Sequence, residues 1–219
     1  MPLPDSGPRE AMHHRAIDMQ GYRRADGLFE IEGRISDRKS APFTVFAADQ
    51  AIAPGAALHD MWVRLVIDEN MLVHEALAVS DATPYAVCPQ AAAPVALLIG
   101  ASVAAGWRAE VHKRIGRASG CTHIVELLVS MGAAAFQTLV ETRRKFGEPR
   151  DAAGVSRRID SCHAFARDGA LVARVWPAVA VTAAVKAALK PAQGAVNPVP
   201  VVAARSSSNL PSTPPSLRR

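Results

Sequence analysis

The chain has 219 residues, 49% of them hydrophobic and 21% charged, which is the balance of a globular protein long enough to bury one real core. Its formal net charge is only +5 and 5% of its residues are aromatic, so it lacks the clustered basic surface and the stacking side chains of a nucleic-acid binder. Three cysteines without a C-x-x-C pair argue against a disulfide framework.

We expect neither a secretory signal nor a membrane-spanning segment in this sequence. The first residues contain no basic segment followed by an apolar run, and the longest apolar stretch, residues 91–105, is short and contains Pro94 and Gly100. We therefore expect a cytoplasmic protein with reduced thiols, a small-molecule substrate, and neither a membrane nor a nucleic acid as partner. The oligomeric state is left open.

Strand patterns fill the first part of the chain. Residues 1–20 are rich in proline and charge and are predicted to form a flexible arm. Alternation of apolar and acidic residues predicts a strand over residues 28–35, with a possible return over 42–47 after a polar turn at 37–40. Residues 61–67 and 71–79 flank a second polar turn and predict a hairpin.

Helical periodicity follows, with helices predicted over residues 89–99, 107–114, 122–145, 162–167 and 175–190. The expected fold class is α+β: a small antiparallel sheet of three to four strands in the N-terminal half, packed against three to five helices. We expect a single domain over residues 21–190. Residues 191–219 are rich in proline, serine and alanine and are predicted to be a disordered tail.

The start of the longest predicted helix carries reactive side chains. Cys121 lies at or before the first turn, where free amide groups lower a thiol pKa, and His123 and Glu126 share one helix face. This set suits a zinc or iron site or a thiolate–imidazole pair, with Glu126 as a proton carrier. The alternative is a capped helix whose histidine makes a structural hydrogen bond.

A second helix start repeats the pattern with Cys162 and His163. Two such starts in one small domain are hard to explain by capping alone, so we expect the two groups to converge on one cavity. The predicted metal ligands are therefore Cys121, His123, Cys162 and His163. Cys88, before Pro89, is added as a further ligand, although taken alone it is better explained as a buried thiol.

Three other residues are candidate catalytic groups. His59 and Asp60 lie where a loop enters a strand, so His59 could act as a general base and Asp60 could orient a histidine. Tyr85 lies in the loop before Cys88 and could donate to a substrate. The sequence has no G-x-G-x-x-G, P-loop, H-E-x-x-H or G-x-S-x-G motif, so no nucleotide cofactor is expected.

Four segments closely resemble an uncharacterised bacterial family, the domain of unknown function 2889. They are residues 23–33 (RRADGLFEIEG), 59–65 (HDMWVRL), 121–128 (CTHIVELL) and 160–164 (DSCHA). The resemblance covers roughly residues 10–177 and implies no established activity. The order of the predicted elements is also similar to that of iron–sulfur scaffold proteins of the nitrogen-fixation U type, in which cysteines from separate loops meet at one site.

Three functions remain open at this point. The first is a small-molecule enzyme, a hydrolase or lyase with a Cys/His metal or thiolate–imidazole site, placed by conjecture in aromatic-compound catabolism. The second is a non-catalytic metal or iron–sulfur carrier. The third is a plain interaction domain, in which the cysteines and histidines would not converge.

Overall fold

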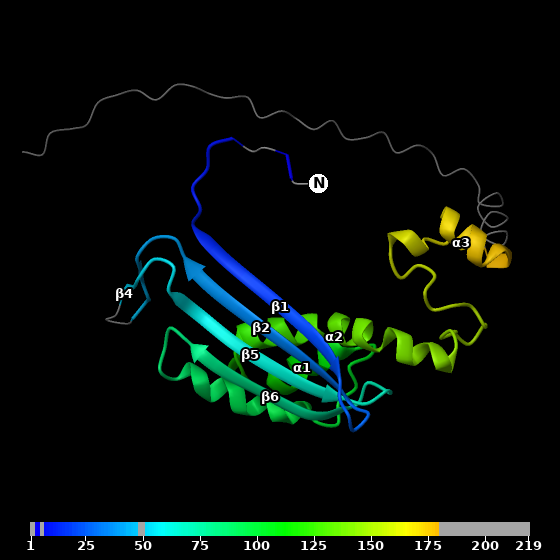
Figure 1. Ribbon diagram of the computed structural model, residues 1–219, viewed down its shortest axis with the longest axis horizontal. Helices are drawn as coiled ribbons and strands as arrows, with labels where there is room; N and C mark the ends of the chain where they lie inside the picture. Colours follow the sequence, from blue (N-terminus) through cyan, green and yellow to red (C-terminus); the bar gives the residue numbers. More distant parts are fainter. Residues whose placement is uncertain (1–2, 5–6, 48–50, 180–219) are drawn as a thin grey trace, which may run out of the picture. The chain divides into compact units, whose positions relative to one another are not determined.

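The computed structural model describes residues 3–4, 7–47 and 51–179 (Figure 1). The chain divides into two compact units, Met1–Glu148 and Pro149–Arg219. The domain predicted over residues 21–190 therefore crosses the boundary between the units. The predicted tail and most of the helix predicted over 175–190 lie outside the described residues.

The first unit contains a four-stranded antiparallel sheet in the order β1-β2-β5-β6. These strands are His13–Arg23 (β1), Phe29–Lys39 (β2), Ala57–Ile67 (β5) and Val73–Ala82 (β6). A second, two-stranded antiparallel sheet is formed by the short strands Phe43–Thr44 (β3) and Ala51–Ile52 (β4). The helices of this unit are Cys88–Leu98 (η1, a 3₁₀ helix), Trp107–Ile115 (α1), Arg117–Ser119 (η2), Thr122–Arg143 (α2) and Arg144–Phe146 (η3).

The predicted α+β class, with its N-terminal antiparallel sheet, is confirmed, but two strand assignments differ. Residues 42–47 do not return along β2, because β2 is already paired with β1 on one side and β5 on the other. Strand β1 begins at His13, inside the arm predicted over residues 1–20. The sequence of β1 shows no alternation of apolar and polar residues, because β1 is an edge strand and nearly all of its residues are exposed.

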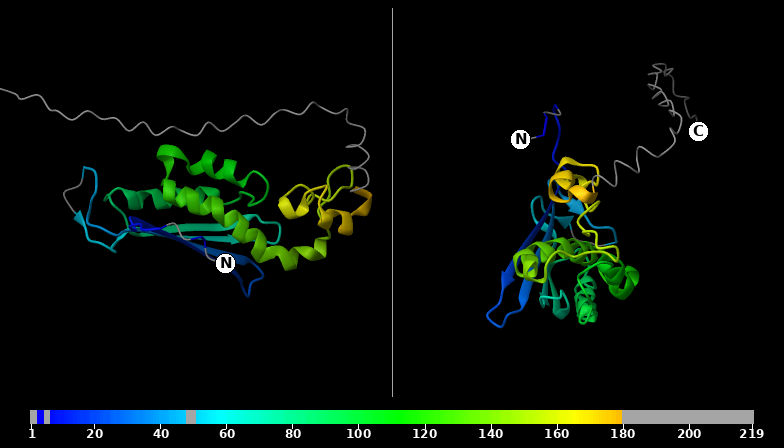
Figure 2. Two further views of the ribbon diagram at one scale, coloured as in Figure 1. Left: turned by 90° about the horizontal axis from the view of Figure 1, so that it is seen from above. Right: turned by 90° about the vertical axis from the view of Figure 1, so that its right-hand side faces the viewer.

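The helices cover one face of the sheet, and the opposite face is open within this unit (Figure 2). Along β2 the buried residues Phe29, Ile31 and Ile35 alternate with half-exposed Glu30, Glu32 and Arg34. This is the two-residue period of an antiparallel sheet with one covered side. Helix α2 packs on β1, β2 and β5, and η1 packs on β6.

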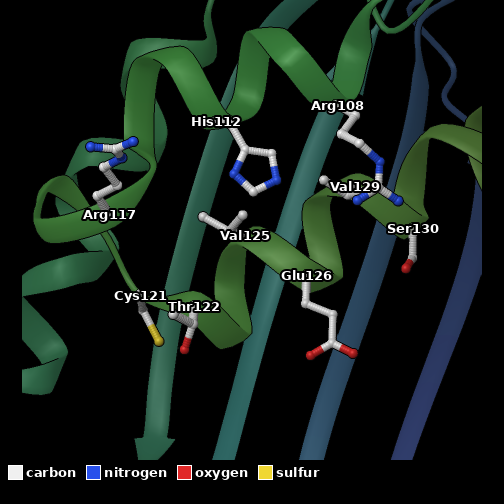
Figure 3. A pocket seen from close by; sticks show the side chains of 9 residues that line it. All are labelled: Arg108, His112, Arg117, Cys121, Thr122, Val125, Glu126, Val129 and Ser130. Carbon is white, nitrogen blue, oxygen red and sulfur yellow. The ribbon is translucent and has the colours of Figure 1, made fainter.

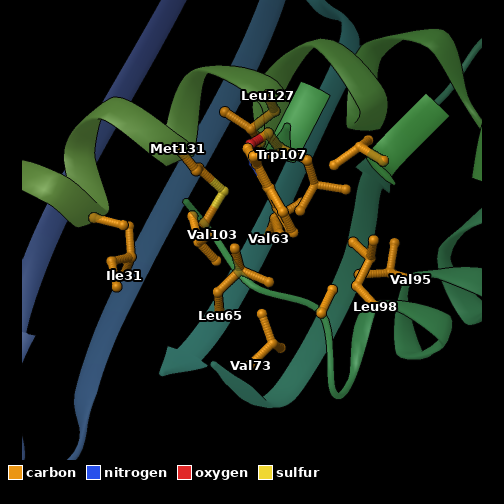
Figure 4. Packing of buried hydrophobic residues seen from close by; sticks show 14 of the residues in the cluster. Ile31, Val63, Leu65, Val73, Val95, Leu98, Val103, Trp107, Leu127 and Met131 are labelled. Carbon is orange, nitrogen blue, oxygen red and sulfur yellow. The ribbon is translucent and has the colours of Figure 1, made fainter. Parts of the chain in front are cut away.

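The core lies between α2 and the sheet (Figure 4). Ile124, Leu127, Leu128, Met131 and Leu139 of α2, predicted as its apolar stripe, are all fully buried. Close approach to β2 is possible because of Gly33, where an added Cβ would lie 3.1 Å from both the Leu127 Cδ1 and the Met131 Sδ. Packing of this stripe fixes both the height and the rotation of α2 over the strands.

Within the described residues, one helical stretch is long and apolar enough to cross a membrane by length and composition alone. It is Thr122–Phe146, which contains an 18-residue window with a mean hydropathy of 1.5. The core helix of a globular protein passes the same test, and the apolar stripe of α2 is indeed buried in the core. The cytoplasmic location stays a prediction.

The described part of the second unit contains the short helices His163–Phe165 (η4) and Ala170–Val175 (α3). Ile159 and Val172 are its buried apolar residues. Asp160 binds Arg167 through its side chain, with Oδ2 3.0 Å from the guanidinium Nε. The helix predicted over residues 162–167 is thus present as the single 3₁₀ turn η4.

Candidate functional site

The site begins with a carboxylate on the buried face of β2. The alternation that buries Phe29, Ile31 and Ile35 continues to Asp37, whose side chain is only 1% exposed. Two strand pairings are interrupted nearby: the β2–β5 register shifts between Asp37 and Arg38, and the β5–β6 register shifts between Asp60 and Met61. Such bulges redirect side chains, and they occur often beside active sites.

Arg15 holds this carboxylate from the neighbouring strand. The β1–β2 register places Arg15 opposite Asp37, and the guanidinium Nε and Nη2 each lie 2.8 Å from one carboxylate oxygen. Burial by itself would raise the pKa of Asp37, but the paired hydrogen bonds from Arg15 lower it to about 2. Asp37 is therefore ionised at neutral pH.

His59 reaches the same carboxylate from β5. It is the register partner of Asp37, and its Nδ1 lies 3.0 Å from the Asp37 Oδ2. Burial lowers the pKa of His59 more than the neighbouring carboxylate raises it, so the ring is neutral at pH 7. With Nδ1 protonated, the ring donates to Asp37 and its Nε2 is a basic acceptor.

His123 arrives from the first turn of α2. Its Nε2 lies 3.6 Å from the Asp37 Oδ2, and its ring stacks on that of His59 with centroids 3.8 Å apart and planes inclined by 32°. A further imidazole, His13 on β1, has its Nε2 3.2 Å from the Asp37 Oδ1. One buried carboxylate thus gathers three imidazoles and one guanidinium.

Cys121 is the N-cap residue of α2 and completes the group. Its Sγ lies 3.7 Å from the Nδ1 of His123 and 3.9 Å from the Sδ of Met61. Burial raises the pKa of the thiol, but hydrogen bonds from His123 and from the backbone amides of Ile124 and His123 outweigh it, so the net pKa is lowered. Cys121, His123 and Asp37 consequently form a continuous chain of polar contacts.

Cys121 also opens onto a pocket of about 450 Å³ between α1, η2 and α2 (Figure 3). Its lining consists of Arg108, His112, Arg117, Cys121, Thr122, Val125, Glu126, Val129 and Ser130. Glu126 connects the pocket to the buried group, because its Oε2 accepts a hydrogen bond of 2.7 Å from Arg15. The thiol therefore lies where a small molecule in the pocket could contact it.

A family model described as "Protein of unknown function (DUF2889)" matches residues 13–137. This match covers more than half of the chain. The chain belongs to this family. The matched range runs from the first residue of β1 into α2. Asp37, the residues that contact it and Cys121 therefore all lie within the DUF2889 region (His13, Arg15, His59 and His123 are the contacting residues). Neither the curated proteins nor the solved structures gave a match.

Within the DUF2889 region, the structure brings together four residues singled out from the sequence. They are His59, Cys121, His123 and Glu126. Asp60 instead points to the opposite face of the sheet, where the Arg34 guanidinium holds both of its oxygens at 2.8 and 2.6 Å. Tyr85 donates from its hydroxyl to the backbone oxygen of Phe46 at 3.0 Å.

The remaining cysteines lie elsewhere in the chain. Cys88 is half-buried at the start of η1. Cys162 and His163 belong to the second unit, and both are exposed there. Their predicted convergence with Cys121 and His123 stays a prediction, because it joins residues of two separate units.

A metal site is best considered at Asp37, His59 and His123, each of which offers a ligand atom within 4.8 Å of the others. This set differs from the predicted ligands, of which it includes only His123. Two features work against binding in the arrangement seen. Arg15 occupies both oxygens of Asp37. The imidazoles are stacked, whereas a shared ion must lie near the plane of both rings to meet both nitrogen lone pairs.

Sequence reasoning did not identify Asp37, Arg15 and His13 as site residues. The sequence predicts a polar turn at Asp37, yet the two-residue period from Phe29 through Ile31 and Ile35 reaches it. That extension was the available signal, because a charged residue on a buried face needs a partner. Arg15 and His13 gave no comparable signal, because only their pairing opposite β2 brings them to the carboxylate.

Proposed function

We propose that this protein is an enzyme acting on a small organic molecule, with the Cys121 thiolate as the reacting group and His123 as its proton partner. The observation that carries the proposal is the chain of contacts from Cys121 through His123 to Asp37, with the thiol open to the pocket. A nucleophile, a base and a group that orients the base are the parts that covalent catalysis requires.

Each residue has a defined role in this proposal. Cys121 passes its proton to the Nδ1 of His123 and becomes the nucleophile. Asp37 is the positioning residue, since its carboxylate faces the Nε2 of His123 and stabilises the imidazolium that forms. Arg15 keeps Asp37 ionised, so that it does not take the proton itself.

Hydrolysis is the reaction that uses all of these groups. The thiolate attacks an acyl carbon, and the carbonyl electron pair moves to oxygen. Collapse then breaks the bond to the leaving group, which takes the proton from His123. Water, deprotonated by His123, cleaves the resulting thioester and frees the thiol. A lyase would use the same thiolate–imidazole pair to remove a proton next to the bond that breaks.

Alkylation by iodoacetamide tests the thiolate directly. We expect Cys121 to react at lower pH than exposed Cys162 of the same molecule, because His123 and the helix amides stabilise the thiolate. His123→Ala should shift the pH profile of Cys121 upward and leave that of Cys162 unchanged. Modification at each cysteine is followed by peptide mass spectrometry. A folded wild-type protein whose Cys121 is unreactive up to the pH at which Cys162 reacts would refute the proposal.

A metal-dependent enzyme is the second candidate, favoured by the proximity of Asp37, His59 and His123. Imidazole and carboxylate ligands with open positions suit zinc or iron, which could activate water. Elemental analysis of wild type, His59→Ala and His123→Ala separates the two candidates. Near one metal per chain, lost in both variants but kept in Asp60→Asn on the opposite face, would support the metal site. A metal-free protein with a reactive Cys121 would support the thiolate.

A further inference from the structure

The wall of the pocket opposite α2 carries two arginines, Arg108 of α1 and Arg117 of η2 (Figure 3). We infer that this pocket takes a small organic carboxylate, which the positive charges of Arg108 and Arg117 attract from the two ends of this wall while its reacting atom faces Cys121. The inference rests on the proposed role of Cys121 and names the substrate class of that site.

Both guanidinium groups are available to a ligand. Arg15, Arg34 and Arg114 each bind a carboxylate side chain within 2.8 Å. By contrast, in the described part of the chain neither the Arg108 nor the Arg117 guanidinium has a hydrogen-bonded or ion-paired partner. A guanidinium matches the planar geometry of a carboxylate and binds it through two parallel hydrogen bonds.

The backbone at Arg117 adds a second observation. Its φ is +56°, in the left-handed region that favours glycine. Gly116 immediately precedes it, so the turn between α1 and η2 places an arginine at a position where its side chain carries a conformational cost. Strained residues of this kind cluster at ligand sites, and the side chain of Arg117 does line the pocket.

The other lining residues define the rest of the ligand. Glu126 is the one acidic residue of the lining, and its carboxylate is paired with Arg15 at 2.7 Å, so it opposes an incoming anion less than a free carboxylate would. Val125 and Val129 give the pocket an apolar side. The ligand that fits therefore has an apolar body as well as its anionic group.

A matched pair of reagents tests the charge preference on the full chain. Iodoacetate and iodoacetamide alkylate a thiol by the same displacement, in which the sulfur–carbon bond forms and iodide leaves, but only iodoacetate is an anion. The measured quantity is the ratio of their rates at Cys121. We expect this ratio to be about tenfold higher in the folded protein than in the urea-unfolded protein, because a cationic cleft concentrates anions.

Three variants assign the effect to residues. Arg108→Gln and Arg117→Gly should each lower the ratio about threefold or more, whereas Arg64→Gln, on the open face of the sheet, removes one positive charge and should not change it. Glycine is chosen at position 117 because it suits the left-handed φ, so this variant keeps the turn. Circular dichroism checks the fold of each variant.

Benzoate then tests binding rather than attraction alone. Benzoate should slow the iodoacetamide reaction of wild-type Cys121 in a saturable way, and benzamide should not. In Arg108→Gln/Arg117→Gly this protection should be lost.

The outcomes separate the two levels of the proposal. Three results would overturn the carboxylate site and leave the thiolate proposal standing, provided that Cys121 reacts readily with iodoacetamide. The first is a rate ratio equal to that of the unfolded protein, and the second is a ratio that Arg108→Gln and Arg117→Gly do not change. The third is the absence of protection by benzoate. A Cys121 inert to both reagents in the folded protein would overturn both.

Discussion

At the scale of single residues, Asp37 organises the site. It is 1% exposed, and it binds Arg15 from β1, His59 from β5 and His123 from α2. A buried carboxylate costs free energy unless it is paired, and here the pairing comes from three different elements. Asp37 therefore couples the positions of the catalytic candidates to the stability of the sheet.

Asp37 should make the stability of the protein depend on pH in acid. Its folded-state pKa of about 2 lies below its ordinary value of 3.8, so the ionised form stabilises the fold. That contribution is complete above about pH 4, is lost as the pH falls towards 2, and amounts to about 2 kcal/mol. Asp37→Asn should be about 3 kcal/mol less stable at pH 7, because Arg15 loses its buried partner and keeps only the exposed Glu126.

Urea unfolding of both proteins at pH 7, 4, 3 and 2 measures this dependence. The difference between them should be constant down to about pH 4 and then shrink. Asp18→Asn is the control, because Asp18 lies at an exposed position of the edge strand β1. A difference for Asp37→Asn that persists unchanged to pH 2 would show that its ionisation does not stabilise the fold.

At the scale of elements, α2 serves both the core and the site. Its N-terminus positions Cys121 and His123, and its interior packs closely on α1. Trp107 of α1 donates from its indole Nε1 to the backbone oxygen of Leu128 at 2.7 Å. Gly132 lies one turn later and leaves room for the same indole ring. Packing between α1 and α2 thus fixes the positions of the two helices that line the pocket beside Cys121.

Gly132→Ala should destabilise the protein although alanine favours helices. A Cβ at this position would lie 2.8 Å from the Trp107 Cδ1, closer than real side chains approach. The indole is held by its hydrogen bond, so overpacking should cost about 1–3 kcal/mol and exceed the propensity gain of about 1 kcal/mol. Thermal unfolding measures the net effect. Ala133→Gly, at an exposed neighbouring position, should lose only about 1 kcal/mol, and a stabilised Gly132→Ala would contradict the close packing.

At the scale of the whole molecule, the first unit has its own core. All members of the buried cluster lie between Phe29 and Leu139, within Met1–Glu148. The family match, residues 13–137, falls in the same unit. Cys162 and His163 lie outside both, in the second unit.

A fragment comprising Met1–Glu148 should fold cooperatively by itself, because it keeps the whole sheet, α2 and their shared core. Its Cys121 should show the same alkylation pH profile as in the full chain. Urea unfolding and peptide mass spectrometry measure the two properties. If the fragment folds but the profile of Cys121 moves towards that of an ordinary thiol, Cys162 or His163 contributes to the site, as the sequence predicts.

Local sequence was sufficient for the features that depend on neighbours along the chain. Two-residue alternation identified the core strands, the apolar stripe identified α2, and the short spacing of Cys121, His123 and Glu126 placed them at one helix start. Tertiary structure alone decided that Asp37 and Arg15 join them. Their meeting depends on the β1–β2 and β2–β5 registers and on the rotation of α2 over Gly33, which packing across the sheet selects. Arg15 thereby contacts Asp37, 22 positions away in the sequence, and Glu126, 111 positions away. No local sequence pattern encodes contacts over such separations.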